Sequence, residues 1–219
     1  MNFAAIKANI RAWNDIRTDS RKLLPHFDGE AYFKFDYTMP KGKNVFLHFY
    51  PAIKQNGSLV FYLIDSNNDS KEKYQEAPSR YADYFTEAVV QKIPHVNPDD
   101  IVVDSRISRE AALNRIAKWD HCYEAWITNK AKNGGLFQAF YMPASNSNTT
   151  IELNYTGYFG LVPNPIDADT CIGLKEDLIL HAETEVFYNT VRPVPPFGDG
   201  GRNEEAFWVL KASTSAITI

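Results

Sequence analysis

Apolar side chains recur every three or four residues in three segments of the chain, a spacing typical of helices that bury one face. The segments are residues 1–24, residues 79–93, and the stretch from residue 108 to the glycines at 134 and 135. Their apolar stripes are Phe3, Ile6, Ile10 and Trp13 in the first, Tyr81, Phe85, Ala88 and Val89 in the second, and Ala112, Ile116, Trp119, Tyr123 and Trp126 in the third. We therefore predict three amphipathic helices.

Runs rich in aromatic and β-branched residues lie between and after these segments, and such runs favour strands. They cover residues 32–38, 45–50, 59–64, 136–142, 150–158, 184–191 and 206–211. The Asn56-Gly57 pair is a hairpin turn signal between the second and third runs. We expect the first three runs to form an antiparallel meander, and the proline-rich residues 161–171 and 192–203 to be irregular.

Three short motifs of the first half recur in the same order in the second half. Ala4-Ala5 followed by Trp13 resembles Ala111-Ala112 followed by Trp119. Further on, FKFDYTMP at 33–40 resembles FQAFYMP at 137–143, and Val-Phe-Tyr occurs at 60–62 and again at 186–188. Chance recurrence in a chain of helices and aromatic strands is the competing explanation. We interpret the pattern as a duplicated unit.

The predicted fold class is therefore α+β, with an internally duplicated unit of one helix plus an antiparallel β-meander. Residues 1–95 form the first unit, and residues 96–219 form the second, with an insertion near residues 157–182. The units build either two sheets or one extended antiparallel sheet with packed helices, and both can belong to one compact domain. A groove between the repeats is then the default place for a ligand.

Composition and charge exclude several classes of function. The 219 residues are 44% hydrophobic and 23% charged, with a net charge of −4 and no dense basic cluster, which argues against a nucleic-acid partner. No stretch approaches the 18 apolar residues of a membrane span, and residues 1–24 lack the apolar core of a signal peptide. Two cysteines, Cys122 and Cys171, are too few for a disulfide framework, which fits a reducing compartment. We expect a cytoplasmic protein, with no membrane partner.

Residues 65–76, DSNNDSKEKYQE, have the spacing of a calcium-binding loop. The oxygen-bearing side chains at positions 1, 3, 5 and 12 are Asp65, Asn67, Asp69 and Glu76. Position 6 is serine where such a loop needs glycine, and two lysines would lie beside the cation. A polar connection between a strand and a helix explains every residue without an ion, so we predict neither a metal nor another cofactor.

Catalytic signatures are absent: the chain has no HExxH, GxSxG, P-loop or GxGxxG motif. His48 alternates with two aromatic residues on one strand face and is a candidate acid or base. Glu183 and Glu185 share a strand face, and Arg192 follows them. A hydrolase-like enzyme with a dispersed site around these residues is the alternative, provided that His48 and one glutamate line the same cavity. Cys122 is predicted to be a small core residue.

Binding without catalysis is the favoured interpretation. Aromatic residues make up 14% of the chain, and an aromatic-rich sheet face or the groove between the repeats would present them to a ligand. The candidate binding residues are Tyr32, Tyr50, Tyr62, Tyr141, Tyr155 and Tyr188. The expected partner is a protein or a small apolar ligand, and the interpretation requires an exposed aromatic patch or groove.

Overall fold

The computed structural model describes residues 1–42, 44–92, 107–143, 149–162, 170–182, 187–188, 191–194 and 207–214. Its strands are β1 (Tyr32–Met39), β2 (Phe46–Ile53), β3 (Leu59–Asp65), β4 (Thr86–Gln91), β5 (Ala139–Pro143), β6 (Ile151–Val162), β7 (Lys175–Ala182), β8 (Phe187–Tyr188) and β9 (Arg192–Val194). The α-helices are α1 (Phe3–Ile16), α2 (Ser20–Leu23), α3 (Lys71–Glu76), α4 (Arg109–Lys132) and α5 (Trp208–Thr214). Short 3-10 helices are η1 (Leu24–His26), η2 (Tyr81–Tyr84) and η3 (Cys171–Gly173).

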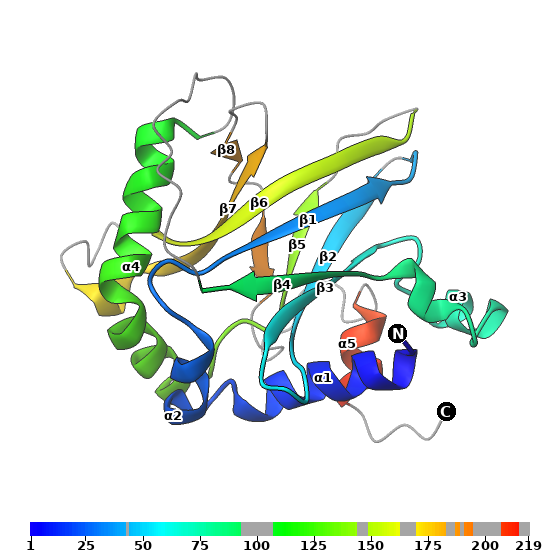
Figure 1. The fold of residues 1–219 in the computed structure, drawn as a ribbon, viewed down its shortest axis with the longest axis horizontal. Coiled ribbons are helices and arrows are strands. Elements are labelled where there is room, and N and C mark those ends of the chain that lie inside the picture. Colours follow the sequence, from blue (N-terminus) through cyan, green and yellow to red (C-terminus); the bar gives the residue numbers. More distant parts are fainter. Residues whose placement is uncertain are drawn as a thin grey trace.

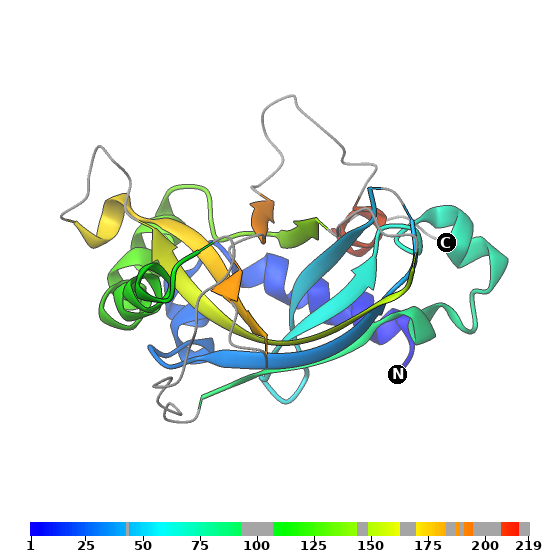
Figure 2. The ribbon, with the colours of Figure 1, turned by 90° about the horizontal axis from the view of Figure 1, so that it is seen from above.

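All nine strands form one antiparallel sheet in the order β8-β7-β6-β1-β4-β3-β2-β5-β9 (Figure 1). The sheet curls along its long strands β1 and β6 (Figure 2), and β9 at one end of the order approaches β7 near the other. The α+β class is therefore confirmed, and the strands make one extended sheet rather than two. Both halves of the chain contribute neighbouring strands to it, and the internal duplication stays a prediction.

The central strands β2 and β3 are buried on both faces. Along β3, Phe61 and Leu63 belong to one apolar cluster, while Val60 and Tyr62 belong to a second cluster on the opposite face. Helix α4 covers the first cluster where it packs on β6, and α1 and α5 pack over the second. Strand β1 alternates buried and exposed side chains instead, so only one of its faces enters the core.

The predicted stripes of α1 and α4 are confirmed, because their apolar positions face these clusters. Phe3, Ile6, Ile10 and Trp13 are all buried in α1. Ser108 caps α4 by accepting a hydrogen bond from the Ala111 amide at 3.1 Å. Gly134 and Gly135 follow its C-terminus with φ angles of 113° and 90°, a region that favours glycine.

Four expectations are wrong, the first being the irregular segment 192–203, because its first residues form β9, Arg192–Val194. The first three strands form no meander: β2 and β3 form the expected hairpin, but β1 pairs with β4 and β6. Residues 79–93 were predicted as a helix and instead form η2 and β4, where Ala88 and Val90 are buried and Val89 is exposed, the period of a strand. Residues 206–211 were predicted as a strand, but α5 covers Trp208–Thr214.

Strand β7 was missed altogether, because it lies in the segment assigned to an insertion. Its apolar stretch is short and is preceded by charged residues, so its periodicity is weak. It nevertheless pairs with β6 over eight residues. The unit boundary near residue 95 lies outside the described residues.

Gly157 of β6 provides a direct test of this packing. A Cβ atom at this position would lie 2.3 Å from the ring of Phe33, its partner in β1, which is fully buried. We expect Gly157→Ala to lower the free energy of unfolding by about 1–3 kcal/mol, because the ring has no room to retreat. Gly160→Ala on the same strand, whose closest neighbours would be 3.3 Å away, is the milder control. Chemical denaturation of both variants measures the difference, and equal losses would contradict the packing.

Candidate functional site

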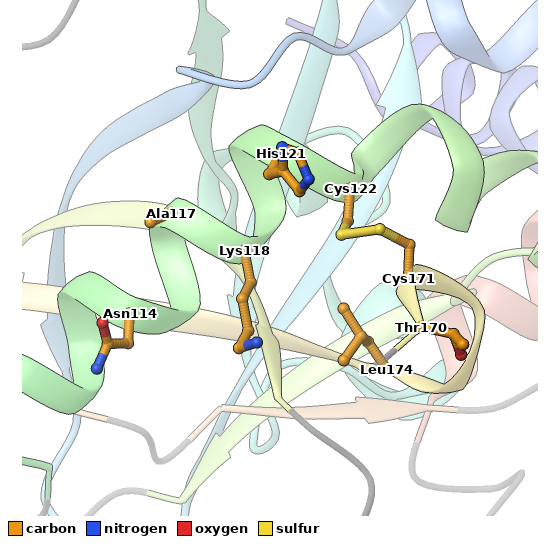
Figure 3. A pocket seen from close by; sticks show the side chains of 8 residues that line it. All are labelled: Asn114, Ala117, Lys118, His121, Cys122, Thr170, Cys171 and Leu174. Carbon is orange, nitrogen blue, oxygen red and sulfur yellow. A yellow bond between two sulfur atoms is a disulfide. The ribbon is translucent and has the colours of Figure 1, made fainter. Parts of the chain in front are cut away.

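Helix α4 and the 3-10 helix η3 are joined by a disulfide bond between Cys122 and Cys171 (Figure 3). The two Cα atoms are 5.3 Å apart, although 49 positions separate the residues in the sequence. Cys122 is buried in the core, as predicted, but the expectation of reduced cysteines is wrong. Because disulfides persist mainly in oxidising compartments, the cysteines no longer support a cytoplasmic location.

The segment that follows η3 is also fixed against α4 by polar contacts. The indole N–H of Trp126 donates a hydrogen bond to the Leu174 carbonyl at 2.9 Å. In the second turn of α4, the Arg115 guanidinium lies 2.7 Å from the carboxylate of Asp177, which is almost fully buried. A covalent bond, a buried hydrogen bond and an ion pair therefore hold η3 and the start of β7 in one position on the helix.

Two hollows lie along the exposed side of α4, and η3 contributes to both. The first has a volume of about 360 Å³ beside the disulfide, and the second has a volume of about 510 Å³ toward the C-terminal half of the helix. The first is lined by the two cysteines with Asn114, Lys118, His121 and Thr170. The second is lined chiefly by Leu24, Glu124, Thr128, Lys132 and Ile172. We call the residues that line these hollows the α4 outer face.

Ile172 is the large apolar side chain of the α4 outer face that is exposed to solvent. It is 56% exposed, and it lies next to the disulfide-bonded Cys171. Among the residues that the structure describes, the other exposed large apolar side chains are Met1, Tyr84 and Val89. The α4 outer face thus combines an exposed apolar side chain on an anchored segment with hollows of mixed polar and apolar lining. The periodicity of the sequence does not single out the α4 outer face, because its polar residues are those of any solvent-exposed helix face.

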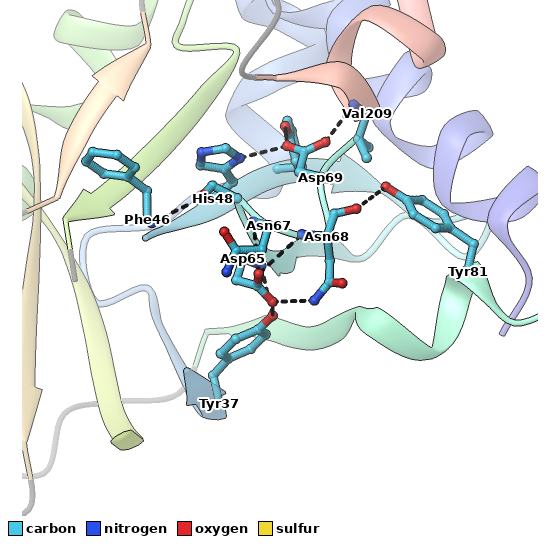
Figure 4. Close-up of polar contacts among 11 residues, drawn as sticks. Tyr37, Phe46, His48, Asp65, Asn67, Asn68, Asp69, Tyr81 and Val209 are labelled. Atoms are coloured by element: carbon cyan, nitrogen blue, oxygen red, sulfur yellow. Dashed lines mark hydrogen bonds and ion pairs between the residues drawn. The ribbon is translucent and has the colours of Figure 1, made fainter. Parts of the chain in front are cut away.

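Residues 65–76 form a hydrogen-bonded connection that starts at the end of β3 (Figure 4). The carboxylate of Asp65 accepts hydrogen bonds from the amides of Asn67 and Asn68 at 3.0 and 3.2 Å, and from the Asn68 side chain at 2.7 Å. The Tyr37 hydroxyl donates to it at 2.9 Å from β1. These bonds satisfy a carboxylate that is only 2% exposed.

A second buried carboxylate, that of Asp69, links three elements. It accepts hydrogen bonds from His48 Nδ1 at 2.7 Å, from the Tyr50 hydroxyl, and from the Val209 amide in α5 at 2.9 Å. We call Asp69, His48, Tyr50 and Val209 the Asp69 cluster. Nδ1 of His48 carries a proton in this arrangement, because a carboxylate can only accept. The His48 ring also stacks on Phe207 with the ring centres 4.3 Å apart.

The calcium ligands are not brought together by this connection. The oxygens of Asp65 and Asp69 are occupied by protein donors, and the Glu76 carboxylate instead pairs with Lys73 on the exposed side of α3 at 2.7 Å. The backbone N–H of Asn67 donates to the Asp65 carboxylate, as in an ordinary turn. Within the described ranges, no group of three His, Cys, Asp or Glu side chains is placed to hold a metal ion.

The dispersed catalytic site is only partly described. His48 is 2% exposed and belongs to the Asp69 cluster, away from both hollows of the α4 outer face. Glu183 and Glu185 lie outside the described residues, as does the side chain of Arg192, whose backbone pairs with Tyr141 in the sheet. The requirement that His48 and one of the glutamates share a cavity stays a prediction.

The five candidate tyrosines whose side chains the structure describes do not gather on one open face. Tyr50 and Tyr62 are buried, and the Tyr62 hydroxyl accepts a hydrogen bond from Asn9 at 2.8 Å. Tyr32, Tyr141 and Tyr155 are half-buried, and Tyr155 packs against the apolar cluster opposite to that of Tyr141. Tyr188 lies in β8, but its side chain is outside the described part of the chain. Most of the aromatic content therefore builds the core.

Comparisons with family models, with curated proteins and with solved structures return no match for this chain. Among the helices of the described ranges, none is both long and apolar enough to cross a bilayer.

Replacement of Asp69 tests the Asp69 cluster. Asp69→Asn keeps the size of the side chain but replaces one accepting oxygen by an NH₂ group, which faces groups that themselves donate. We therefore expect a loss of about 2–4 kcal/mol in the free energy of unfolding. Asp83→Asn removes a carboxylate from an exposed pair with Arg80 and should cost under about 0.5 kcal/mol. Urea denaturation of both variants checks this, and a loss for Asp69→Asn no larger than that of the control would contradict the structural role.

Alkaline pH tests the buried tyrosines of the same region. Burial, and next the nearby aspartate charges, raise the pKa of Tyr37, Tyr50 and Tyr81 far above the ordinary value. Above about pH 10 the unfolded chain loses these protons while the folded chain keeps them, so stability falls as pH rises, by about 1.4 kcal/mol per pH unit for each tyrosine. Between pH 9 and 11, a range centred on the unfolded-state pKa, Tyr81→Phe should reduce the total loss of stability by about 1.4 kcal/mol, which is half of the full slope over two pH units. Unfolding free energies between pH 9 and 11 measure it, and an unchanged slope would contradict the assignment.

Proposed function

We propose that the protein is a binding protein whose α4 outer face docks on another protein. The observation that supports this most is the position of Ile172, an exposed apolar side chain that lines the second hollow and directly follows Cys171, which lines the first. An isolated exposed isoleucine is ordinary on a protein surface. An isoleucine in the wall of one hollow, next in sequence to a disulfide-bonded cysteine in the wall of a second, is more than that, because it offers an apolar side chain and two recesses to one complementary surface.

Rigidity is the second support for this proposal. A partner that binds a flexible segment must overcome the loss of conformational freedom, whereas a fixed segment avoids that cost. The disulfide, the Trp126 hydrogen bond and the Arg115–Asp177 ion pair fix the segment around η3 before any partner arrives. The α4 outer face is thus preorganised for binding.

The lining of both hollows mixes apolar surface with charged side chains, and we take this mixture to favour a protein over a small apolar ligand. Pockets for apolar ligands are lined mainly by apolar and aromatic side chains. Here Asn114, Lys118 and His121 line the first hollow, while Glu124 and Lys132 line the second. One apolar projection within a mixed polar rim is typical of the smaller interfaces between proteins. The partner we propose carries an apolar recess for Ile172 and polar side chains that enter the hollows.

The hydrolase-like alternative keeps one supporting observation, the hydrogen bond between His48 Nδ1 and the Asp69 carboxylate. A carboxylate in this position orients a histidine whose other nitrogen can act as a base. The deep burial of both side chains and the stacking of Phe207 on the imidazole oppose this role, since a substrate would have to displace them. We therefore favour binding.

Substitution of Ile172 tests the docking proposal. Ile172→Glu places a charge where the partner would be apolar, and we expect at least a tenfold loss of affinity, corresponding to about 1.4 kcal/mol, for the partner recovered by affinity capture from native lysate. Val89→Glu, at an exposed apolar position on β4, is the matched control.

The measurement compares the proteins retained by wild type and by both variants, followed by titration of any protein lost only with Ile172→Glu. Melting temperatures of the variants should stay close to that of the wild type, because both side chains are on the surface. Identical sets of retained proteins and identical affinities for the two variants would contradict docking at the α4 outer face.

A further inference from the structure

We propose that the Cys122–Cys171 disulfide is an exchange site that accepts a small anionic thiol of the glutathione type, with Cys171 as the sulfur that becomes modified. This inference goes beyond the proposed docking function and does not depend on it. It rests on three features of the first hollow: access to one sulfur, the charge of the lining, and the bonds that remain after exchange.

Access to the two sulfurs is unequal. Cys122 is 7% exposed and belongs to the apolar core, whereas Cys171 is only partly buried, in η3. Both line the first hollow, which is about 360 Å³ in volume and open along the helix (Figure 3). Thiol exchange requires a thiolate to reach one sulfur while the other leaves. Because Cys171 is the more exposed of the two residues, its sulfur is the one that the thiolate attacks in our proposal, and the sulfur of Cys122 is the one that leaves.

The lining of the hollow favours an anion. Its charged or titratable members besides the cysteines are Lys118 and His121, and none of its lining residues carries a carboxylate. Lys118 precedes Cys122 by four residues on α4, so both side chains lie on the same face of the helix. An ammonium group there attracts an incoming thiolate with its carboxylates, and it also stabilises the thiolate that departs on Cys122.

The chemistry of the step is balanced without another reactant. The sulfur of the incoming thiolate forms a bond to Sγ of Cys171, the Cys171–Cys122 bond breaks, and its electron pair stays on Sγ of Cys122. That sulfur then takes up a proton from water. The small thiol is oxidised to the level of a disulfide, and Cys122 is reduced to a thiol.

The fold tolerates this step because other bonds hold the segment. The Trp126 indole still donates to the Leu174 carbonyl, and Lys130 still pairs with Glu176 at 3.2 Å. Leu174 itself is buried. Exchange therefore frees η3 locally while the start of β7 keeps its place on α4, so the modified protein stays folded.

Reaction of the folded, air-oxidised protein with reduced glutathione tests this proposal. Iodoacetamide quenching at successive times traps Cys122 as it is released, and peptide mapping then locates the mixed disulfide. We expect glutathione on Cys171 and alkylation on Cys122, under conditions in which circular dichroism is unchanged. Lys118→Gln should slow the reaction about two- to fivefold, the effect of one exposed ion pair. Lys132→Gln, which changes an exposed lysine of the second hollow, should leave the rate unchanged.

The remaining comparison uses 2-mercaptoethanol, a thiol without carboxylates. The rate at which it attacks the disulfide should be much less sensitive to Lys118→Gln than the rate for glutathione. Each of four results would overturn the proposal: two free thiols in the air-oxidised protein, exchange only in denaturant, glutathione on Cys122 instead of Cys171, or equal glutathione rates for wild type and Lys118→Gln. Loss of protein docking in Ile172→Glu is read out separately, so failure of either proposal can be told from failure of the other.

Discussion

The hydrogen bonds to the buried carboxylate of Asp69 are the interactions on which the packing of α5 against β2 depends. The three donors come from β2 and from α5, and the most distant of them, the Val209 amide, is 140 positions away in sequence. A charged oxygen removed from water must be matched by donors, or it opposes folding strongly. This requirement fixes where α5 docks, and it explains why His48 and Tyr50 interrupt the apolar face of β2.

A different kind of constraint acts at the α4 end of the sheet. There the disulfide attaches η3 to the helix and the Trp126 hydrogen bond attaches the residue that follows η3, and between these two points Ile172 is exposed. The Asp69 cluster uses its polar groups internally, whereas the α4 outer face leaves polar groups and one isoleucine free to meet another molecule. This contrast is why we place binding at α4 and assign an architectural role to His48.

Elements with a single strong periodicity could be predicted from the sequence, and elements whose pattern fits two periods could not. The stripes of α1 and α4 are long and have clear ends, so both helices were predicted. Tyr81, Phe85 and Ala88 have the spacing of a helix stripe. In the structure Tyr81 belongs to η2 and Ala88 to β4, and Phe85 lies between these two elements. Sequence singled out His48 and Asp69 under separate hypotheses, as a base and as a calcium ligand. Their pairing is a long-range contact that no local pattern encodes, and the same holds for the disulfide.

The claim that His48 serves the fold through Asp69 can be tested most directly on the histidine ring itself. A long-range proton–nitrogen NMR spectrum of the imidazoles reports which ring nitrogen of His48 carries a proton. The structure predicts a proton on Nδ1 that exchanges slowly with water, because the donor is buried and held by the carboxylate. A neutral ring protonated only on Nε2, or an Nδ1 proton in rapid exchange with solvent, would contradict the account.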